Sequence, residues 1–311
     1  MAKYCFGIDV GGTTIKCGLF SEDGTALDKW EIRTRVEENG KYVLPDVAET
    51  ILEKIAQKNL DKKEIAGVGI GIPGPVNDDG IVNGAVNLHW GVVDIVKELG
   101  DMTGLRVKAG NDANVAALGE LWQGGGAGYQ DMVMVTLGTG VGGGIILGGK
   151  IVAGAHGAAG EIGHAHVEDE MDEPCNCGRC GCLEQYTSAT GIANLAQKVL
   201  ASSEEPSTMR DHKNISAKTV WDAVKEGDAL AIEVAKTFGD YLGKALAVFS
   251  CVVDPQIIVD AGGVSKAGPV VLEYIMGPFQ KYCFPACKTI EFGLAKLGND
   301  AGIYGAAKMV L

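Results

Sequence analysis

The chain repeats one local pattern, in which a strand, a glycine-rich turn, a second strand, another turn and a third strand follow one another. The pattern spans residues 3–33, which contain CFGIDVGGTTIKCGLF, and returns at 131–154, which contain MVMVTLGTGVGGGIILGG. Each copy predicts a three-stranded antiparallel meander. Because both copies carry the glycine turn after the first strand, we expect two hairpins that face each other across a cleft and offer backbone amides to one polyphosphate.

The first glycine turn has the residue types that a phosphate needs. Gly11 and Gly12 let the backbone approach a ligand closely, and Thr13, Thr14 and Lys16 supply hydroxyl, amide and cationic donors. Alone, the turn is equally well explained as a hairpin with a glycine bulge. The pair of turns is therefore more informative than either member.

The segments between and after the meanders alternate strands with helices. Apolar residues at helical spacing predict helices at 43–58, near 92–102, and at 190–200, 216–226 and 229–252. Buried strands are predicted in IAGVGIGIPGPV, LRVKAG and PQIIVDAGGV, a solvent-exposed loop in ASSEEPSTMRDHKN, and a terminal helix with its own Asn/Asp cap in NDAGIYGAAKMVL. This alternation is typical of an α/β protein.

Polar residues crowd the end of the LRVKAG strand. Asp112 directly precedes ANVAALGELW, so it is placed to cap that helix by accepting backbone N–H bonds. Capping does not explain why Asn111, Asp112 and Asn114 gather there, where open α/β sheets place ligands. The functional interpretation is that Asp112 is a general base for a substrate hydroxyl. A second pair of glycines, Gly262 and Gly263 after the PQIIVDAGGV strand, would suit a ribose or adenine lying on exposed backbone.

Composition excludes some classes of protein. The 311 residues carry a net charge of −13 and show no Lys/Arg cluster, so we expect no nucleic-acid partner. Residues 3–10 are apolar but lack the basic start and cleavage site of a signal peptide, and no segment has membrane-spanning length. Nine cysteines, an odd number, fit a cytoplasmic metal site better than a disulfide framework.

The stretch 156–184 predicts that metal site. Six candidate ligands, two histidines and four cysteines, crowd into it, and zinc needs four of this kind: His164, His166, Cys175, Cys177, Cys180 and Cys182. Spacing alone does not choose among them. A thiol redox pair at Cys177 and Cys180 is disfavoured, because it does not open a helix after a strand. The acidic run at 168–173 is interpreted as a solvated loop.

Motifs in order along nearly the whole chain resemble the ROK family (repressors, open reading frames and kinases), most closely its bacterial glucokinases. They are GIDVGGTTIK (7–16), GIPGPV (71–76), NDAN (111–114), TLGTGVGGG (136–144), GAAGEIGH (157–164) and CNCGRCGCLE (175–184). The resemblance implies the two-lobed fold of actin, Hsp70 and sugar kinases, built from duplicated ribonuclease H-like domains. It implies a small lobe at 1–111, with helix 299–311 packing back on it, and a large lobe at 112–298 that carries the zinc loop.

The same resemblance implies an ATP-dependent glucokinase acting in glycolysis, with Asp112 as the base. The substrate contacts that it implies are Gly74, Asn111, Glu161, His164 and Glu184. ATP and its magnesium would contact Asp9, Gly11, Gly12, Thr13, Thr14 and Lys16 at the first turn, Thr139, Gly140, Gly142 and Gly143 at the second, and Gly262 and Gly263. A structural zinc would take His164, Cys175, Cys177 and Cys182, which leaves Cys180 as a departure from the family pattern.

Other functions stay open at this point. The substrate could be mannose, fructose or an N-acetylated amino sugar, although VNLHW at 86–90 is more similar to the glucokinases. The chain could also be a sugar-sensing relative that does not bind DNA; the family's repressors carry a helix-turn-helix domain ahead of the glycine turn, and the first strand begins too early for one. The resemblance suggests a homo-oligomer, a dimer or a tetramer. Polyphosphate as an alternative to ATP is not decided by the sequence.

Overall fold

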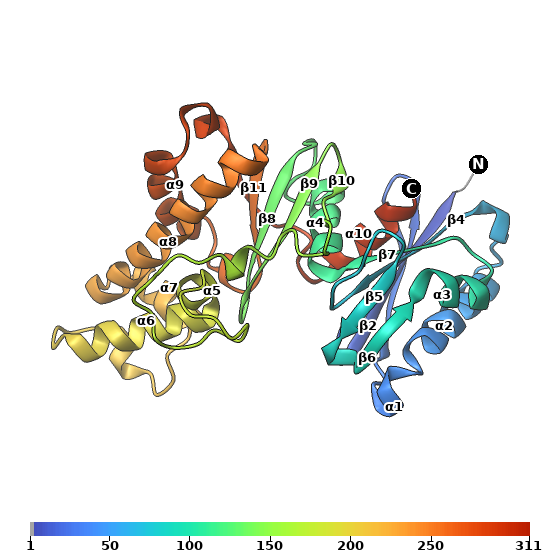
Figure 1. Cartoon of the computed structure of the whole chain (residues 1–311), viewed down its shortest axis with the longest axis horizontal. Coiled ribbons are helices and arrows are strands. Elements are labelled where there is room, and N and C mark those ends of the chain that lie inside the picture. Colours follow the sequence, from blue (N-terminus) through green and yellow to red (C-terminus); the bar gives the residue numbers. More distant parts are fainter. Residues whose placement is uncertain (1–2) are drawn as a thin grey trace. The chain divides into compact units, whose positions relative to one another are not determined.

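The computed structural model describes residues 3–311. Its described residues form two compact units, each with its own five-stranded sheet (Figure 1). Unit 1 comprises the residues up to Gln130, Gly144–Gly160 and Lys296–Leu311, and unit 2 comprises Asp131–Gly143 and Glu161–Ala295. The predicted boundary at residue 111 differs from this division, because the helix that begins at Asp112 packs within unit 1.

The two sheets share one topology. In the first sheet the order is β3-β2-β1-β4-β7, and in the second it is β10-β9-β8-β11-β12. In both sheets three antiparallel strands are followed by two parallel ones. The strands are β1 Tyr4–Val10, β2 Thr14–Ser21, β3 Ala26–Arg33, β4 Ile65–Ile72, β7 Val107–Asn111, β8 Met132–Leu137, β9 Val141–Leu147, β10 Lys150–Ile151, β11 Ile257–Ala261 and β12 Glu291–Leu294. The predicted duplication of the meander is confirmed.

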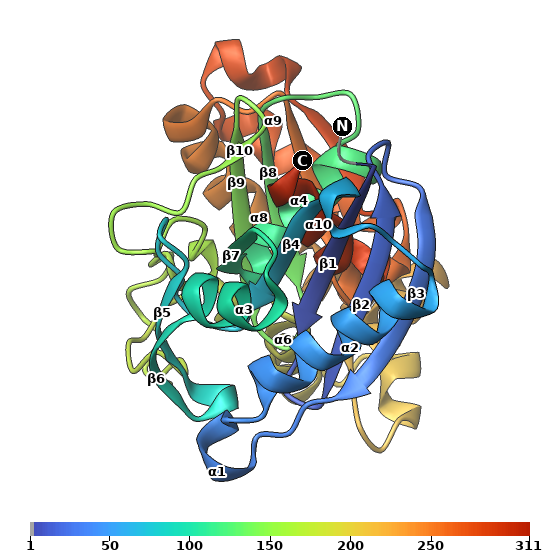
Figure 2. The same cartoon turned by 90° about the vertical axis from the view of Figure 1, so that its right-hand side faces the viewer.

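Helices cover both faces of the first sheet (Figure 2). One face of its strands packs on α2 (Val43–Gln57) and α3 (Ile95–Thr103) in a core that includes Phe6, Ile8 and Ile70. On the other face, Cys5 and Phe20 pack on α10 (Ala301–Val310). This two-sided burial explains why β1 and β4 are apolar runs rather than alternating strands.

Helix α10 lies unusually close to its neighbours. A β-carbon added at Gly305 would lie 1.7 Å from the carbonyl oxygen of Val115 in α4 (Asp112–Gln123), and one at Gly119 would lie 2.1 Å from that of Ala301. Only glycine permits this contact between the backbones of α4 and α10. Gly7 and Gly69 bring β1 and β4 equally close to α10. The glycines thus set the packing of unit 1.

Unit 2 surrounds a long helix. Helix α8 (Ala229–Val253) packs against α5 (Glu184–Thr187), α6 (Ala189–Ser202), α7 (Ala217–Lys225) and α9 (Val270–Tyr282). Apart from short 3₁₀ turns, the remaining elements of the described residues are the short α1 (Glu37–Gly40) and a hairpin of β5 (Ile81–Ala85) and β6 (Trp90–Asp94), both in unit 1.

Two sequence expectations need correction. The helix predicted near 92–102 begins only at Ile95, because Trp90–Asp94 pairs with β5 as a strand. The terminal helix has no side-chain cap, since Asp300 instead forms an ion pair with Lys29 at 2.7 Å. The loop at 201–214 is exposed over most of its length, as predicted, and it contains a short 3₁₀ turn, Thr208–Asp211.

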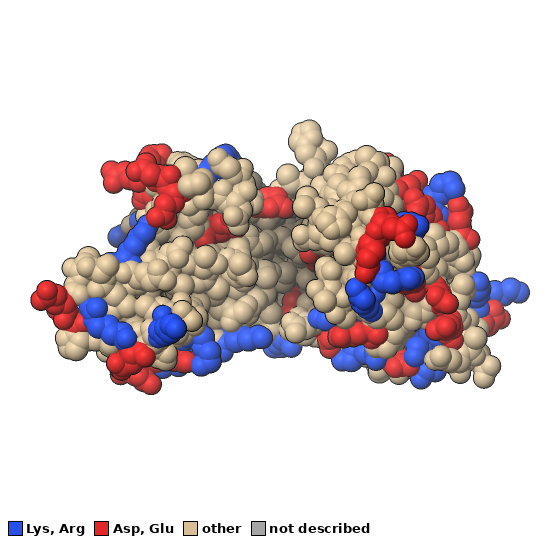
Figure 3. Space-filling view, turned by 90° about the horizontal axis from the view of Figure 1, so that it is seen from below, with Lys and Arg blue, Asp and Glu red and all other residues tan. Residues whose placement is uncertain are grey.

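Charged side chains of both signs are spread over the face shown in Figure 3. Among residues 3–311, none of the helices combines the length and the apolar character needed to cross a membrane.

Candidate active site and metal cluster

The polar residues predicted in unit 1 lie at one edge of its sheet. Asp9 in β1 pairs in register with Gly71 in β4, and Gly71 pairs with Gly110 in β7, one residue before Asn111. Asp112 follows as the first residue of α4. Parallel strands therefore bring Asp9 and Asp112 to the same carboxyl end of the sheet.

Asn111, rather than Asp112, caps helix α4. The Asn111 Oδ1 atom accepts a hydrogen bond from the Asn114 backbone N–H at 3.1 Å, so the predicted capping role of Asp112 is wrong. The Asn111 amide nitrogen donates to Asp112 Oδ1 at 3.0 Å and to the Gly74 carbonyl at 3.2 Å. The Ala113 N–H also donates to Asp112 Oδ1, at 2.8 Å. This carboxylate is therefore oriented at the positive end of a helix.

Asp9 is a second carboxyl group of this edge. Burial raises the pKa of Asp9 to about 6, Lys16 lowers it, and Asp112 raises it. Because Asp9 and Lys16 are register partners on β1 and β2, the cation lies beside the acid. The Lys16 ammonium also donates to the Asn299 carbonyl at 2.8 Å, which leaves two of its three protons for other acceptors.

The first glycine turn is tightly closed. The Gly11 N–H donates to the Thr14 carbonyl at 3.0 Å, and the Thr34 hydroxyl donates to the Gly11 carbonyl at 2.7 Å. A β-carbon at Gly11 would lie 2.8 Å from the Thr14 oxygen, whereas one at Gly12 would meet nothing closer than 4.0 Å. Gly12 therefore leaves open space beside its backbone.

The second glycine turn contacts Glu184. The Val141 N–H donates to Glu184 Oε2 at 3.3 Å, and a β-carbon at Gly140 would lie 2.6 Å from the same oxygen. The Thr190 hydroxyl donates to the Thr139 carbonyl at 3.0 Å, which ties the start of α6 to this turn. The turn and Glu184 thus belong to one hydrogen-bonded cluster within unit 2.

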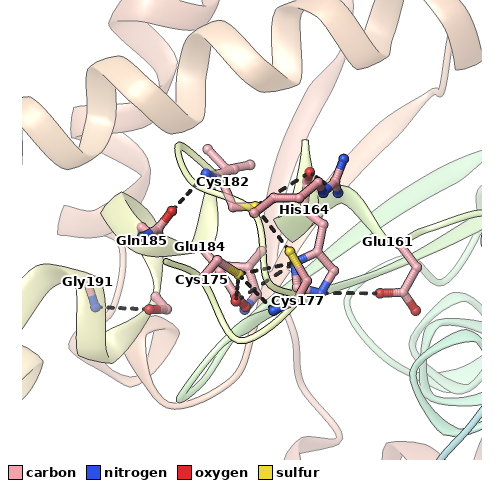
Figure 4. Close-up of polar contacts among 12 residues, drawn as sticks. Glu161, His164, Cys175, Cys177, Cys182, Glu184, Gln185 and Gly191 are labelled. Atoms are coloured by element: carbon pink, nitrogen blue, oxygen red, sulfur yellow. Dashed lines mark hydrogen bonds and ion pairs between the residues drawn. The ribbon is translucent and has the colours of Figure 1, made fainter. Parts of the chain in front are cut away.

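Four of the six candidate metal ligands converge (Figure 4). The ligand atoms of His164, Cys175, Cys177 and Cys182 all lie within 4.8 Å of one another. Cys177 Sγ is 3.6 Å from Cys182 Sγ, and Cys175 Sγ is 3.6 Å from His164 Nδ1. The edges of a zinc tetrahedron with S and N ligands measure about 3.5–3.8 Å, and a disulfide would need about 2.05 Å. The donor set and its spacing therefore fit zinc.

Two candidates lie outside this cluster. The His166 ring contacts the Cys180 carbonyl at 3.1 Å through Nδ1 and Asp169 at 2.8 Å through Nε2. The Cys180 thiol donates to the Asp172 carbonyl at 3.6 Å. The structure thus brings together the four ligands that the family pattern selects. His166 and Cys180, which spacing alone could not exclude, lie apart from them.

His164 has two different sides. Its Nδ1 faces the cysteines and lies 3.8 Å from Glu184 Oε1, while its Nε2 lies 4.0 Å from Glu161 Oε2 (Figure 4). A metal held through Nδ1 would leave Nε2 and Glu161 for a polar ligand. Cys175 donates to Glu184 Oε1 at 2.8 Å, so Glu184 is tied to the cluster as well.

Gly262 occupies a left-handed conformation at φ 92°, and a β-carbon there would lie 2.5 Å from the Leu137 carbonyl at the end of β8. Gly263 has only that oxygen within reach, at 4.0 Å. Just before them, Asp260 is 3% exposed, and neither of its carboxyl oxygens has a hydrogen-bond partner among the described residues. Burial raises the pKa of Asp260 to about 8.

The profile of the ROK family matches residues 5–311. The chain belongs to the ROK family. A glucokinase of Halalkalibacterium halodurans is 41% identical to this ROK protein, over 99% of the chain and 95% of the relative. A glucokinase of Thermotoga maritima is 37% identical, over 98% and 96%.

The crystal structure of a ROK family glucokinase from Streptomyces griseus, in complex with glucose and AMPPNP, superposes with a TM-score of 0.73. Its identity is 31%, and the match covers 98% of each chain. This ROK protein thus has the α/β fold shared by actin, Hsp70 and sugar kinases, as the sequence predicted.

Sequence reasoning missed two polar groups of this ROK protein. Arg179 donates to the His164 carbonyl at 3.0 Å, and its hydrogen bonds lower the pKa of Cys177 to about 6. Glu120, 1% exposed, accepts backbone N–H bonds from Gly125, Lys296 and Leu297 at 2.7–3.0 Å. Of these two groups only Arg179, inside the cysteine run, carried a sequence signal. Asn114, which the NDAN motif indicated, is buried, and its Oδ1 atom has no hydrogen-bond partner among the described residues.

Proposed function

We propose that the protein phosphorylates the 6-hydroxyl of glucose with ATP, and that Asp112 is the general base. The observation that carries this proposal is the pair Asn111–Asp112 at the carboxyl end of β7, where an amide and a helix N-terminus orient one carboxylate. The full-length similarity to glucokinases supports glucose as the substrate.

In the proposed reaction, Asp112 accepts the proton of the sugar hydroxyl. The hydroxyl oxygen forms a bond to the γ-phosphorus, the bond from that phosphorus to the bridging oxygen breaks, and ADP leaves with that oxygen. Gly74 and Asn111 of unit 1, and Glu161, His164 and Glu184 of unit 2, would bind the other sugar hydroxyls. Carboxylates and amides suit this task because each can bond two neighbouring hydroxyls.

ATP would contact the two glycine turns. In unit 1 these are Gly11 to Thr14 with Lys16, and in unit 2 Thr139, Gly140, Gly142 and Gly143, with Gly262 and Gly263 for the nucleoside. Magnesium would neutralise phosphate charge near Asp9, because this ion prefers oxygen ligands such as the carboxylate of Asp9. A polyphosphate donor would need the same phosphate contacts but not Gly262 and Gly263.

Zinc at His164, Cys175, Cys177 and Cys182 would be structural, since protein atoms fill all four positions. It would fix the ring of His164 and the loop that leads into Glu184. We assign it no step in the phosphoryl transfer.

We also propose that the protein acts in the cytoplasm as a homo-oligomer, through unit 2. Large apolar side chains stand exposed on α8 and just after α9, among them Val248 and Val252, at 62% and 82%, and Phe284 at 61%. Val248 and Val252 are four residues apart on α8 and so share one face of it, and contiguous exposed apolar side chains mark interfaces.

A coupled assay of ADP release tests the function. Glucose, mannose, fructose and N-acetylated amino sugars are compared at equal concentration with ATP, and glucose is repeated with polyphosphate. We expect the highest kcat/KM for glucose with ATP. A higher value for another hexose would replace the substrate, and turnover with none of them would support the sugar-sensing alternative.

A further inference from the structure

Strand β1 presents one row of side chains to helix α10, and both elements belong to unit 1. Cys5 packs with this helix, and a β-carbon at Gly7 would lie 1.9 Å from the Ile303 carbonyl oxygen. Because side chains alternate along a strand, Asp9 points to the same face, whereas Ile8 belongs to the core on the other face. The carboxyl group of Asp9 therefore lies on the side of α10.

Gly302, the second residue of α10, lies directly on this carboxyl group. A β-carbon at Gly302 would lie 2.5 Å from Asp9 Cγ, 2.6 Å from Oδ2 and 2.9 Å from Cβ, and these are the three closest atoms that it would meet. The backbone of Gly302 is not left-handed, and alanine is the better helix former. What the glycine provides at this position is room for the side chain of Asp9.

Packing on α10 limits where the Asp9 carboxylate can point. The carboxylate accepts no hydrogen bond from a described residue, and it is only half-buried. Its register partner Lys16 donates to the carbonyl of Asn299, in the turn just before α10. The same short segment of chain thus contacts both charged groups, the cation through Asn299 and the acid through Gly302.

Helix α10 is held in place on its other sides. A β-carbon at Gly305 would lie 1.7 Å from the Val115 carbonyl oxygen of α4, so the two helix backbones touch. Just before α10, the backbone N–H groups of Lys296 and Leu297 donate to the buried carboxylate of Glu120 at 3.0 and 2.8 Å. A new side chain at the start of α10 is therefore accommodated more easily by turning one carboxyl group than by moving the helix.

We propose that Gly302 is a positioning residue, which keeps the carboxylate of Asp9 in the direction that magnesium binding requires. The choice of magnesium rests on the proposed function, in which this ion lies near Asp9. In Gly302→Ala, the added methyl group would take the present place of the carboxyl group, and Asp9 would adopt another rotamer. The rest of unit 1 would keep its structure, because only a side chain has to move.

Crystal structures of Gly302→Ala and of Gly277→Ala test the positioning directly. Gly277 is the matched control, since it also lies in a helix, α9, and a β-carbon there would meet nothing within 4 Å. We expect a different Asp9 rotamer and an unmoved α10 in Gly302→Ala, and no change at Asp9 in the control. An unchanged Asp9, or a Gly302→Ala chain that fails to fold, would overturn the proposal.

Titration calorimetry with AMPPNP, a non-hydrolysable ATP analogue, tests the consequence for magnesium. The affinity is measured with and without magnesium in the wild type, Gly302→Ala, Asp9→Ala and the double variant. We expect Gly302→Ala to lower the gain in affinity from magnesium by about tenfold, and to change it by less than about twofold when Asp9 is already alanine.

Equal losses from Gly302→Ala in both backgrounds would mean that Gly302 does not act through Asp9, and would overturn the proposal. Equal affinities of the wild type with and without magnesium would overturn the magnesium contact. Neither measurement needs turnover. A protein that fails to phosphorylate glucose would still give either result, so this proposal and the proposed function fail separately.

Discussion

The two sheets have the same topology, but an aspartate near the end of a parallel strand has different surroundings in each. In the first sheet, Asp9 lies beside Lys16 and near Asp112, and its pKa is raised to about 6. In the second, Asp260 has no partner for either oxygen among the described residues, and its pKa is raised to about 8. Asp9 can thus ionise at neutral pH, whereas Asp260 is mostly protonated.

This difference suggests that the two sheets have different roles. The first sheet gathers ionised groups at the carboxyl ends of its strands, as proton transfer and magnesium binding require. The second sheet offers backbone N–H and C=O groups at the glycines that follow β8 and β11. The loop that carries the proposed zinc ligands comes after its third strand, β10. Substituting carboxylates in each sheet should therefore affect activity in one and stability in the other.

The largest effect is expected for Asp112→Asn. Loss of the base should lower kcat on the order of 10³-fold to 10⁴-fold, while an amide of the same size keeps the fold. The ADP-release assay measures the rate, and calorimetry with glucose measures binding. Asp101→Asn, an exposed aspartate of α3, is the control. Turnover within tenfold of the wild type would assign the base elsewhere.

Asp9→Asn should lower kcat by on the order of 10²-fold, because a neutral amide binds magnesium more weakly. Raising the magnesium concentration should restore part of the rate. Since the pKa of Asp9 is raised to about 6, the wild-type rate should also fall as the pH drops through that value. A variant with normal magnesium dependence would remove Asp9 from the metal site and weaken the contrast between the sheets.

Zinc removal tests the role of the metal cluster, which only unit 2 contains among the described residues. Stripping the metal should raise KM for glucose about tenfold, through the loosened His164 and Glu184, and lower the melting temperature by roughly 5 °C. Metal analysis before and after chelation checks the loss. Cys180→Ser should retain the full metal content, because Cys180 lies outside the cluster. Unchanged KM and melting temperature after verified removal would contradict a structural role.

Asp260→Leu should change stability and leave kcat intact. In the folded wild type the Asp260 carboxyl keeps its proton up to a pH of about 8, whereas the unfolded chain releases it near 3.8. The contribution of Asp260 to wild-type stability therefore falls as the pH rises from about 4 to about 8. The leucine variant should melt a few degrees higher than the wild type at pH 8, on the order of 3 °C, and show a smaller loss with pH. A lower melting temperature at pH 8 would mean that Asp260 has an ionic partner.

Much of the fold was predictable because its signals are local. Glycine turns between apolar strands predicted both meanders. Apolar residues at helical spacing located α2, α6, α7 and α8 to within a few residues. The β5–β6 hairpin was missed, because Trp90–Asp94 follows a left-handed His89 rather than a glycine turn and its valines also suit a helix start.

The site was predictable where residue types cluster in sequence. NDAN and the cysteine run indicated a base and a metal, but the choice of Asn111 as the helix cap depends on the turn at the end of β7. The orphaned oxygens of Asn114 and Asp260 had no signal, since burial without a partner depends on packing from distant segments. The contacts of the remaining proposed site residues with sugar and ATP stay predictions.

The close packing of α10 also determines how late during synthesis unit 1 can complete its fold. Gly7 and Gly69 accept α10 directly on their backbones, so the face of β1 stays uncovered until residues beyond 300 have left the ribosome. Chain segments separated by almost the whole sequence must meet before unit 1 is complete, which slows folding and prolongs exposure of an apolar sheet. The nascent first unit is thus a natural client for chaperones, whereas the helices of unit 2 can assemble from neighbouring segments.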